Sequence, residues 1–554
     1  MSQAINVLTL RYLNPRRAAV FLPEIHTWTW RGFCLATLLV LLSPLGFAEE
    51  SVKKPAPTGR VTVEISGIKG EQLMNVQGYL EIRQFNGKAA PSMARLRYLH
   101  RAAPEQIQRA LQPFAYYKAQ VKSELTQTPS GWLARYDITR GPAIKIRKLD
   151  LRVTGGGEQD PEFQKALAET PLKVGKRLDQ SAYEKLKKRF QALASERGYF
   201  DAKLEQHEVR IHLPSDSATI ALHLETGERY KLGEVHFNED KPWISPALLQ
   251  RYNEIKPEQP YEAADLQQLQ GDLSNSDYYK QVEINADPKA ARDRVIPVEV
   301  KLSPRNPRKY IIGVGYGTDT GARVKAGISG RRINNRGHHY TTELLVSQIK
   351  YGIAGEYIIP AGDPRTDAYG LRASYEDEHS DSRNYQAYNI GGYFKYRDDL
   401  WIKTYALDYR VERFELTDES PTSTLLIPSV DWTRTFPAEL EKRVHPKKGA
   451  WLQLRLRGGH DAFLSDTTFL QPLASAKWIR GFDNHSRIIG RLAIGTTYVD
   501  DFSQLPTSLR YFTGGDRTVR GYEYAVIAPR DNQNEVVGGK NLNEASVEYE
   551  YPIK

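Results

Sequence analysis

An arginine and two glutamates near the C-terminal end have the residue types and the spacing to form an ion pair. Arg520 lies within residues 511–522, where two glycines precede it and Gly-Tyr follows it. Glu548 and Glu550 lie in a segment that alternates apolar and polar residues, so they share one face of a β-strand. A guanidinium that is partly removed from water should pair with a carboxylate in bidentate geometry. The sequence therefore predicts that the loop carrying Arg520 folds back against the strand carrying these glutamates.

Other residue patterns that resemble enzyme or metal sites do not fit their surroundings. The glycines of residues 313–317 alternate as in a strand, and no helix start or Lys-Ser/Thr pair follows, as a phosphate-binding loop requires. His338 and His339 are adjacent rather than one helical turn apart, and no neighbouring carboxylate completes a metal site. We therefore expect a protein that is not an enzyme and holds neither a metal nor a cofactor.

Cysteine content and charge exclude further classes of function. Cys34 is the only cysteine, which rules out a disulfide framework, a thiolate metal site and a cysteine nucleophile in the chain that follows it. The net charge of +10 is spread along the chain, without the Lys/Arg block and interleaved aromatics of nucleic-acid binding. The basic residues are best explained as a solvated surface.

The N-terminal residues have the pattern of an export signal. Arginines precede an apolar run at residues 32–47, and Gly46-Phe47-Ala48 offers a small-residue cleavage site. We interpret residues 1–48 as a signal peptide and residues 49–59 as a linker; an uncleaved anchor helix is the alternative for the first segment.

A pair of aromatic residues recurs three times after the linker. Each pair follows a helical stretch and precedes strand-like alternation, and the first residues of the pairs are 83 and 79 positions apart by subtraction. The pairs are Tyr116-Tyr117, Tyr199-Phe200 and Tyr278-Tyr279. In the clearest helix, Tyr183, Leu186, Phe190 and Leu193 fall on one face. We therefore predict three α+β repeats of strand, helix, helix, strand, strand, at residues 60–142, 143–228 and 229–305, with the aromatics as core residues.

From residue 306 to residue 554 the pattern changes to amphipathic segments of about ten residues, separated by Gly, Asp, Asn and Pro. Segments of this length suit tilted strands that cross a membrane. About twelve such strands are visible, eleven before the loop of Arg520 and one after it. The sequence predicts an antiparallel transmembrane β-barrel, because open strand edges cannot face lipid.

The segment Val519-Arg520-Gly521-Tyr522 resembles the Val-Arg-Gly-Tyr/Phe signature of the outer-membrane assembly superfamily that includes BamA and TamA. The βααββ repeats look like POTRA domains, and a count of three matches the TamA branch. This resemblance implies sixteen barrel strands and a final aromatic recognition signal. The chain would then be incomplete at its C-terminus; a barrel that closes with twelve strands is the alternative.

The resemblance also implies roles for individual residues. The loop arginine is expected to lie in the barrel lumen and to pair with Glu548, with Glu550 as the less favoured partner. The acidic residue that the family places on the following strand is missing, so Arg520 is expected to be under-satisfied. The first strand would form one side of a lateral gate. The loop signature comprises Gly514, Gly515, Asp516, Val519, Arg520, Gly521 and Tyr522, and the gate strand contributes Ile312, Gly313, Gly315 and Gly317.

The function implied is insertion of β-barrel proteins, autotransporters among them, into the outer membrane of a Gram-negative bacterium. The POTRA repeats would lie in the periplasm and meet unfolded clients or a TamB-like inner-membrane-anchored protein, and the barrel would contact outer-membrane lipid. Alternatives are a two-partner secretion transporter, which has two POTRA domains and a plug helix, a general BamA-like factor with more repeats, and a passive porin-like barrel.

Overall fold

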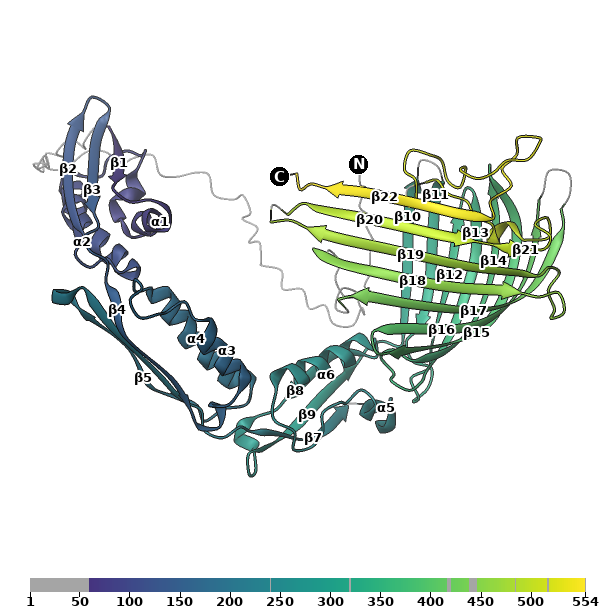
Figure 1. Cartoon of the computed structure of the whole chain (residues 1–554), viewed down its shortest axis with the longest axis horizontal. Coiled ribbons are helices and arrows are strands. Elements are labelled where there is room, and N and C mark those ends of the chain that lie inside the picture. The colour runs from purple at the N-terminus through teal and green to yellow at the C-terminus, as the bar shows by residue number, and fades with distance from the viewer. Residues whose placement is uncertain are drawn as a thin grey trace, which may run out of the picture.

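The computed structural model shows three small α/β units followed by one large, strongly curved sheet (Figure 1). Among the described helices, none combines the length and apolar character needed to cross a bilayer. The predicted signal peptide and nearly all of the predicted linker lie outside the described residues. The structure describes residues 59–239, 241–317, 320–415, 420–437, 446–483, 485–515 and 518–553.

Each α/β unit has the predicted order of strand, helix, helix, strand, strand. The last strand lies in the middle of each three-stranded sheet, parallel to the first and antiparallel to the second. The first unit contains β1 (Arg60–Ser66), α1 (Gly70–Tyr79), α2 (Met93–Leu111), β2 (Gln120–Thr128) and β3 (Gly131–Thr139). The second contains β4 (Lys145–Thr154), α3 (Pro161–Glu169), α4 (Gln180–Glu196), β5 (Lys203–His212) and β6 (Ser217–Glu225). The third contains β7 (Lys231–Glu239), α5 (Pro246–Gln250), α6 (Ala263–Asn275), β8 (Tyr279–Asn285) and β9 (Val295–Pro304).

Helix α4 shows how the local sequence sets these elements. The side chain of Asp179 caps its start by accepting a hydrogen bond from the Ala182 amide. Gly198, with φ of +78°, follows its end, in the left-handed conformation common after helices. The apolar face predicted from the sequence is buried, and Phe190 and Leu193 reach the core of the second unit.

The recurring aromatic pairs do more than fill the cores of their own units. In the first two pairs, the leading residue packs in its own unit and the second residue packs into the next one. Tyr117 packs against the second core, and its hydroxyl accepts a hydrogen bond from Gln180 at 2.6 Å. Phe200 packs against the third core, edge-on to Tyr230 and Tyr261. The prediction that these aromatics pack in cores was therefore incomplete, because they also join successive units.

Charged residues reinforce the joint between the second and third units. Arg197 donates to the carboxylate of Asp160 at 2.6 Å, and Arg229 donates to Glu262 at 3.0 Å and to the backbone oxygen of Arg197 at 2.8 Å. Burial disfavours the charged form of Asp160, but the hydrogen bonds from Arg197, the Glu162 amide and Tyr199, together with the charge of Arg197, outweigh it and lower the pKa of that carboxyl. The ion pair at this joint therefore persists to a lower pH than an ordinary aspartate would allow.

The large sheet contains thirteen strands, twelve of them on one antiparallel path from β10 to β22, with β21 (Tyr498–Val499) paired to β19. This confirms the predicted fold class of POTRA-like units before an antiparallel barrel-type sheet. The other strands are β10 (Arg308–Gly317), β11 (Gly321–Gly330), β12 (His339–Ser347), β13 (Lys350–Pro360), β14 (Ala368–Ser380), β15 (Arg383–Asp398), β16 (Trp401–Phe414), β17 (Thr422–Phe436), β18 (Lys448–Gly459), β19 (Phe469–Gly481), β20 (Arg487–Thr496) and β22 (Asn541–Glu550). Strands β14 to β17 have 13 to 16 residues and exceed the predicted length of about ten.

Side chains alternate between two distinct faces of this sheet. The outer face is apolar, with Tyr310, Ile312 and Val314 on β10 between 58% and 71% exposed. The inner face carries charged residues, among them Glu548 and Arg491. Within the described residues, β10 pairs only with β11 and β22 only with β20, so each leaves one row of backbone groups unpaired in the sheet.

The third α/β unit is fixed to one rim of the sheet. The hydroxyl of Tyr278 donates to the backbone oxygen of Gly337 at 2.7 Å, and the Ser245 amide donates to that of Asn335 at 2.8 Å. Arg365, from the connection between β13 and β14, donates to the buried Asp272 of α6 at 3.2 Å. We call this the arm rim, because it is the rim from which the three units extend (Figure 1).

Replacing Phe200 with alanine should loosen the joint between the second and third units. The substitution removes a ring that fills the next unit's core and should cost about 3 kcal/mol of that unit's stability. Spin labels at the exposed positions Glu205 and Lys280 should report a broader distance distribution. The control is Tyr98→Ala, which removes a ring that is 58% exposed on the first unit. A distribution equally narrow in both variants would show that the aromatic ring does not hold the joint.

Candidate functional site: an anchored loop beside two strand edges

The inner face of the last described strand carries a row of acidic residues that meets arginines. Arg520 donates to Glu548 Oε1 at 3.1 Å, and Arg491 of β20 donates to Glu548 Oε2 at 2.9 Å. Glu550, the less favoured partner for Arg520, is directly opposite Arg487 and pairs with it. Glu548 therefore contacts Arg520. Glu550, the next inward-facing residue of β22, pairs with Arg487 instead.

Arg520 is much less shielded from water than the sequence suggested. Its side chain is 66% exposed, whereas that of Glu548 is 23% exposed. The expectation of a partly desolvated guanidinium is wrong for this structure, because the arginine reaches Glu548 from the open interior of the curved sheet. An exposed ion pair of this kind contributes about 0.2–1 kcal/mol, so it orients the loop rather than holding it alone.

The glycines of the loop signature adopt backbone conformations that other residues rarely take. Gly514 has φ of +114°, and a Cβ there would lie 2.4 Å from the backbone oxygen of Glu523. Gly515 donates its amide to the backbone oxygen of Tyr522 at 3.0 Å, and Gly521 has φ of +92°. The turn therefore closes on itself and presents Arg520 towards β22.

The remaining signature residues have different surroundings. Val519 is half-buried, Tyr522 is 59% exposed, and Asp516 lies outside the described residues. Thr513 adds a second contact to β22, because its hydroxyl donates to Glu544 at 2.9 Å.

A buried arginine that sequence reasoning missed organises the first part of the loop. Arg510 is 6% exposed and donates to the backbone oxygens of Phe502, Ser503, Leu505 and Val537 at 2.8–3.2 Å. These carbonyls come from both arms of the loop, so one side chain draws the arms together. Nothing local in the sequence marks Arg510, since its partners are backbone atoms up to 27 residues away.

Sequence reasoning also missed two charged residues on the inner faces of β15 and β16, which contact the loop. Glu412 of β16 is fully buried and accepts hydrogen bonds from the backbone amide and the hydroxyl of Ser508. Arg383 of β15 pairs with Glu378 at 2.6 Å and lies over the loop rings of Phe512 and Tyr524, at 5.4 and 5.1 Å. The loop thus contacts β15, β16 and β22 on their inner faces.

In the part of the chain that the structure describes, the predicted gate strand forms one unpaired edge of the sheet. Ile312 points to the outer face, while Gly313, Gly315 and Gly317 alternate with it towards the inner face. A Cβ at Gly313 would have no atom nearer than 3.9 Å, so this glycine leaves open space beside Lys325. Because glycine has no side chain, β10 presents few side-chain atoms on its inner face at these positions, while its pairing with β11 stays in full register.

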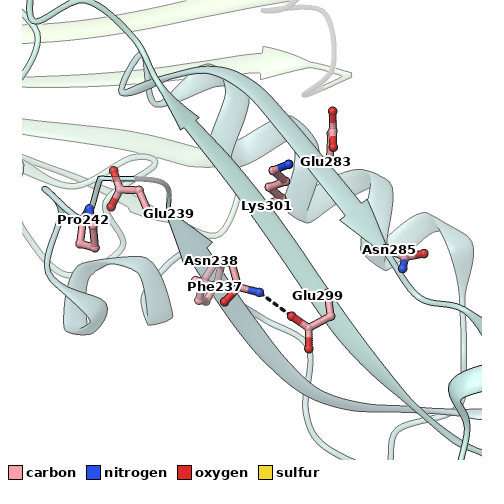
Figure 2. A pocket seen from close by; sticks show the side chains of 8 residues that line it. All are labelled: Phe237, Asn238, Glu239, Pro242, Glu283, Asn285, Glu299 and Lys301. Atoms are coloured by element: carbon pink, nitrogen blue, oxygen red, sulfur yellow. Dashed lines mark hydrogen bonds between the residues drawn. The ribbon is translucent and has the colours of Figure 1, made fainter.

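A hollow of about 580 Å³ lies on the third α/β unit. Figure 2 shows its polar side chains, among them Glu239, Glu283 and Glu299, spread along three strands rather than converging. Within the part of the chain that the structure describes, no cluster of three or more metal-ligating side chains is found. The arrangement with the clearest chemistry is therefore the anchored loop together with the edges of β10 and β22, because these edges offer unpaired backbone donors and acceptors among the described residues.

The buried arginine should matter more for loop anchoring than the signature arginine. Arg510→Ala leaves four carbonyls without their donor, whereas Arg520→Ala removes an exposed ion pair worth about 1 kcal/mol or less. Limited proteolysis of the folded protein should therefore cut residues 500–540 at least several-fold faster in Arg510→Ala than in Arg520→Ala. Glu415→Ala, at an exposed position outside this loop, is the control. Equal cleavage of the two arginine variants would contradict this ranking.

Comparisons with known proteins agree with this architecture. The model of the TamA POTRA domain 1 matches residues 62–140, and the model of the Omp85 superfamily domain matches residues 320–554. The outer membrane protein assembly factor BamA of Nitratidesulfovibrio vulgaris is 22% identical over 304 residues, which cover 53% of this chain and 38% of that protein. The chain thus spans little more than a third of this curated relative.

Solved structures extend the likeness at the level of the fold. BamA from Haemophilus ducreyi lacking POTRA domains 1–3 aligns with a TM-score of 0.57 and 16% identity, covering 74% of this chain and 83% of that one. CdiB from Escherichia coli aligns at 16% identity over 76% of this chain and 80% of that one, with a lower TM-score of 0.38. Residues 62–140 therefore match a TamA-type POTRA domain, and residues 320–554 match an Omp85 superfamily domain.

Proposed function

We propose that this protein is an outer-membrane assembly factor of the TamA type, which templates the folding and insertion of β-barrel clients, autotransporters among them. The observation that carries the proposal is the free edge of β10, on a curved sheet with an apolar outer face. Backbone groups at such an edge cost several kcal/mol each if they enter hydrocarbon unpaired. A client strand that pairs with this edge satisfies its own backbone groups as it enters the membrane.

The anchored loop is attached to the strand at the other end of the sheet. The contacts of Arg520 with Glu548 and of Thr513 with Glu544 attach the loop to β22, and Arg510 joins the arms of the loop. An interior loop held in this way restrains β22 while a client strand pairs with the free edge of β10. The glycines of β10 reduce the number of side chains that a client strand meets when it pairs with this edge.

The three α/β units are proposed to lie in the periplasm and to receive clients or a TamB-like partner. Their outer strands, such as β2, β5 and β8, are paired on one side only among the described residues. An extended polypeptide can add to such an edge by backbone hydrogen bonding. If the third unit docks the partner, removing it should abolish assembly; assembly that continues without it would contradict the docking role.

Crosslinking tests the templating step directly. With Cys34 as the only cysteine, and within the predicted signal peptide, Ile312→Cys on β10 becomes the only thiol of the mature chain if that peptide is cleaved. We expect disulfides from this position to single cysteines along the last strand of an arrested barrel client, with a register that alternates by two residues.

The matched control is Leu456→Cys, which is exposed on the outer face of β18 but lies on a strand paired on both sides. Crosslinks from Leu456 equal to those from Ile312 would indicate contact without pairing. No crosslinks from Ile312, with the protein folded and the client present, would favour a transporter or a passive barrel.

A further inference from the structure

Two cations lie directly opposite each other on the outer face of the sheet, at the arm rim. Lys448 of β18 and Arg480 of β19 are cross-strand partners, and both are exposed. Like charges in this position destabilise a sheet. Within the described part of the chain, neither cation has an ion pair or a side-chain hydrogen bond. The pair is therefore a place where a bound anion would relieve repulsion.

Aromatic side chains flank the two cations and leave room between them. The adjoining cross-strand positions bring Ala450 between Phe436 of β17 and Trp478 of β19. Phe436 is 38% exposed and Trp478 is 48% exposed, and together with Lys448 and Arg480 they line a hollow of about 580 Å³. A small residue between two large rings gives this hollow an apolar floor next to a cationic end.

A third cation, Arg434, lies close to the hollow, and one nitrogen of its guanidinium has no hydrogen-bond partner among the described residues. Arg434 lies on the outer face over the rings of Phe436 and Trp401, at 4.2 and 5.6 Å. Its Nε is shielded from solvent and has no hydrogen-bond partner among the described residues. The connecting residues 438–445 add no net charge, since Glu439 and Glu441 are balanced by Lys442 and Arg443.

The location of these cations at the arm rim indicates which anion can reach them. Aromatic rings and snorkelling cations at the end of a membrane-crossing sheet lie at the level of the lipid headgroups. The arm rim carries the third α/β unit, so on the proposed orientation it faces the periplasm and the inner leaflet of the outer membrane. The phosphates available at that level belong to phospholipids, whose acyl chains would continue along the apolar outer surface of β18 and β19.

We propose that Lys448 and Arg480, flanked by Phe436 and Trp478, bind the phosphate of an anionic phospholipid headgroup on the periplasmic side of the membrane. The inference rests on the proposed membrane location of the sheet but adds a binding site to it. A bound lipid would hold together the β18–β19 end of the sheet, far along the strand path from the free edge of β10. It would thereby keep this wall in register while a client strand pairs with the edge of β10.

The test embeds the full chain in phosphatidylcholine nanodiscs that contain a minor fraction of phosphatidylglycerol. Phosphatidylglycerol retained on the released protein is then counted by native mass spectrometry. We expect the double variant Lys448→Gln/Arg480→Gln to retain about tenfold less than the parent protein, because two surface cations contribute to headgroup binding. The control is Lys403→Gln, because Lys403 also lies near the arm rim but already pairs with Asp398.

The outcomes separate this inference from the proposed function. A protein that does not enter the nanodiscs in folded form, judged by heat-dependent electrophoretic mobility, contradicts the membrane location itself. A folded, embedded protein whose double variant retains as much phosphatidylglycerol as Lys403→Gln overturns only the lipid site. Displacement of phosphatidylglycerol from the parent protein by inorganic phosphate alone would show that the site binds free phosphate rather than a lipid.

Discussion

Unpaired backbone groups are the constraint on which this molecule depends. In hydrocarbon, every amide and carbonyl of a strand must find a partner, and the alternative costs several kcal/mol for each group. Among the described residues, the curved sheet meets this demand along eleven consecutive strand pairings, from β10 to β22, and leaves it unmet at its two edges. An edge that is costly to leave open but simple to pair is suited to accept another strand. The proposed function follows from that energetic asymmetry.

The rest of the chain limits how the edges can move. The loop of residues 500–540 is attached to β22 through Glu544 and Glu548 and to the opposite wall through Glu412. The aromatic pairs that join successive α/β units play a similar part in the arm, because the first and second units each contribute a ring to the core of the next. The loop contacts and the aromatic joints both tie together segments that are far apart in the sequence. The strand at the free edge can therefore move while the loop and the α/β units keep their places.

Much of this architecture follows from local sequence rules. The apolar period of α4, the glycine after it and the two-residue alternation of the sheet each have a local physical cause. The pairing of Arg520 with Glu548 rather than Glu550 could be anticipated from the family resemblance together with strand periodicity. In contrast, the exposure of Arg520 depends on the curvature of the whole sheet, which no local pattern encodes.

Other features had no signal in the sequence. Arg510 binds backbone carbonyls, and Glu412 binds a loop 96 residues further along the chain, so neither contact leaves a recognisable spacing. The second role of Tyr117 and Phe200, as joints to the next unit, also depends on how folded units meet. Sequence repeats showed that these residues recur, but only the packing shows which core each ring enters.

Backbone hydrogen exchange on the membrane-embedded protein tests the central claim most directly. Exchange would be compared with and without an arrested barrel client, using β18 as an internal reference because it is paired on both sides. If β10 is a templating edge, its amides that point away from β11 should gain protection when the client binds, while those of β18 stay unchanged. Protection confined to the α/β units, with β10 unaltered, would contradict the account.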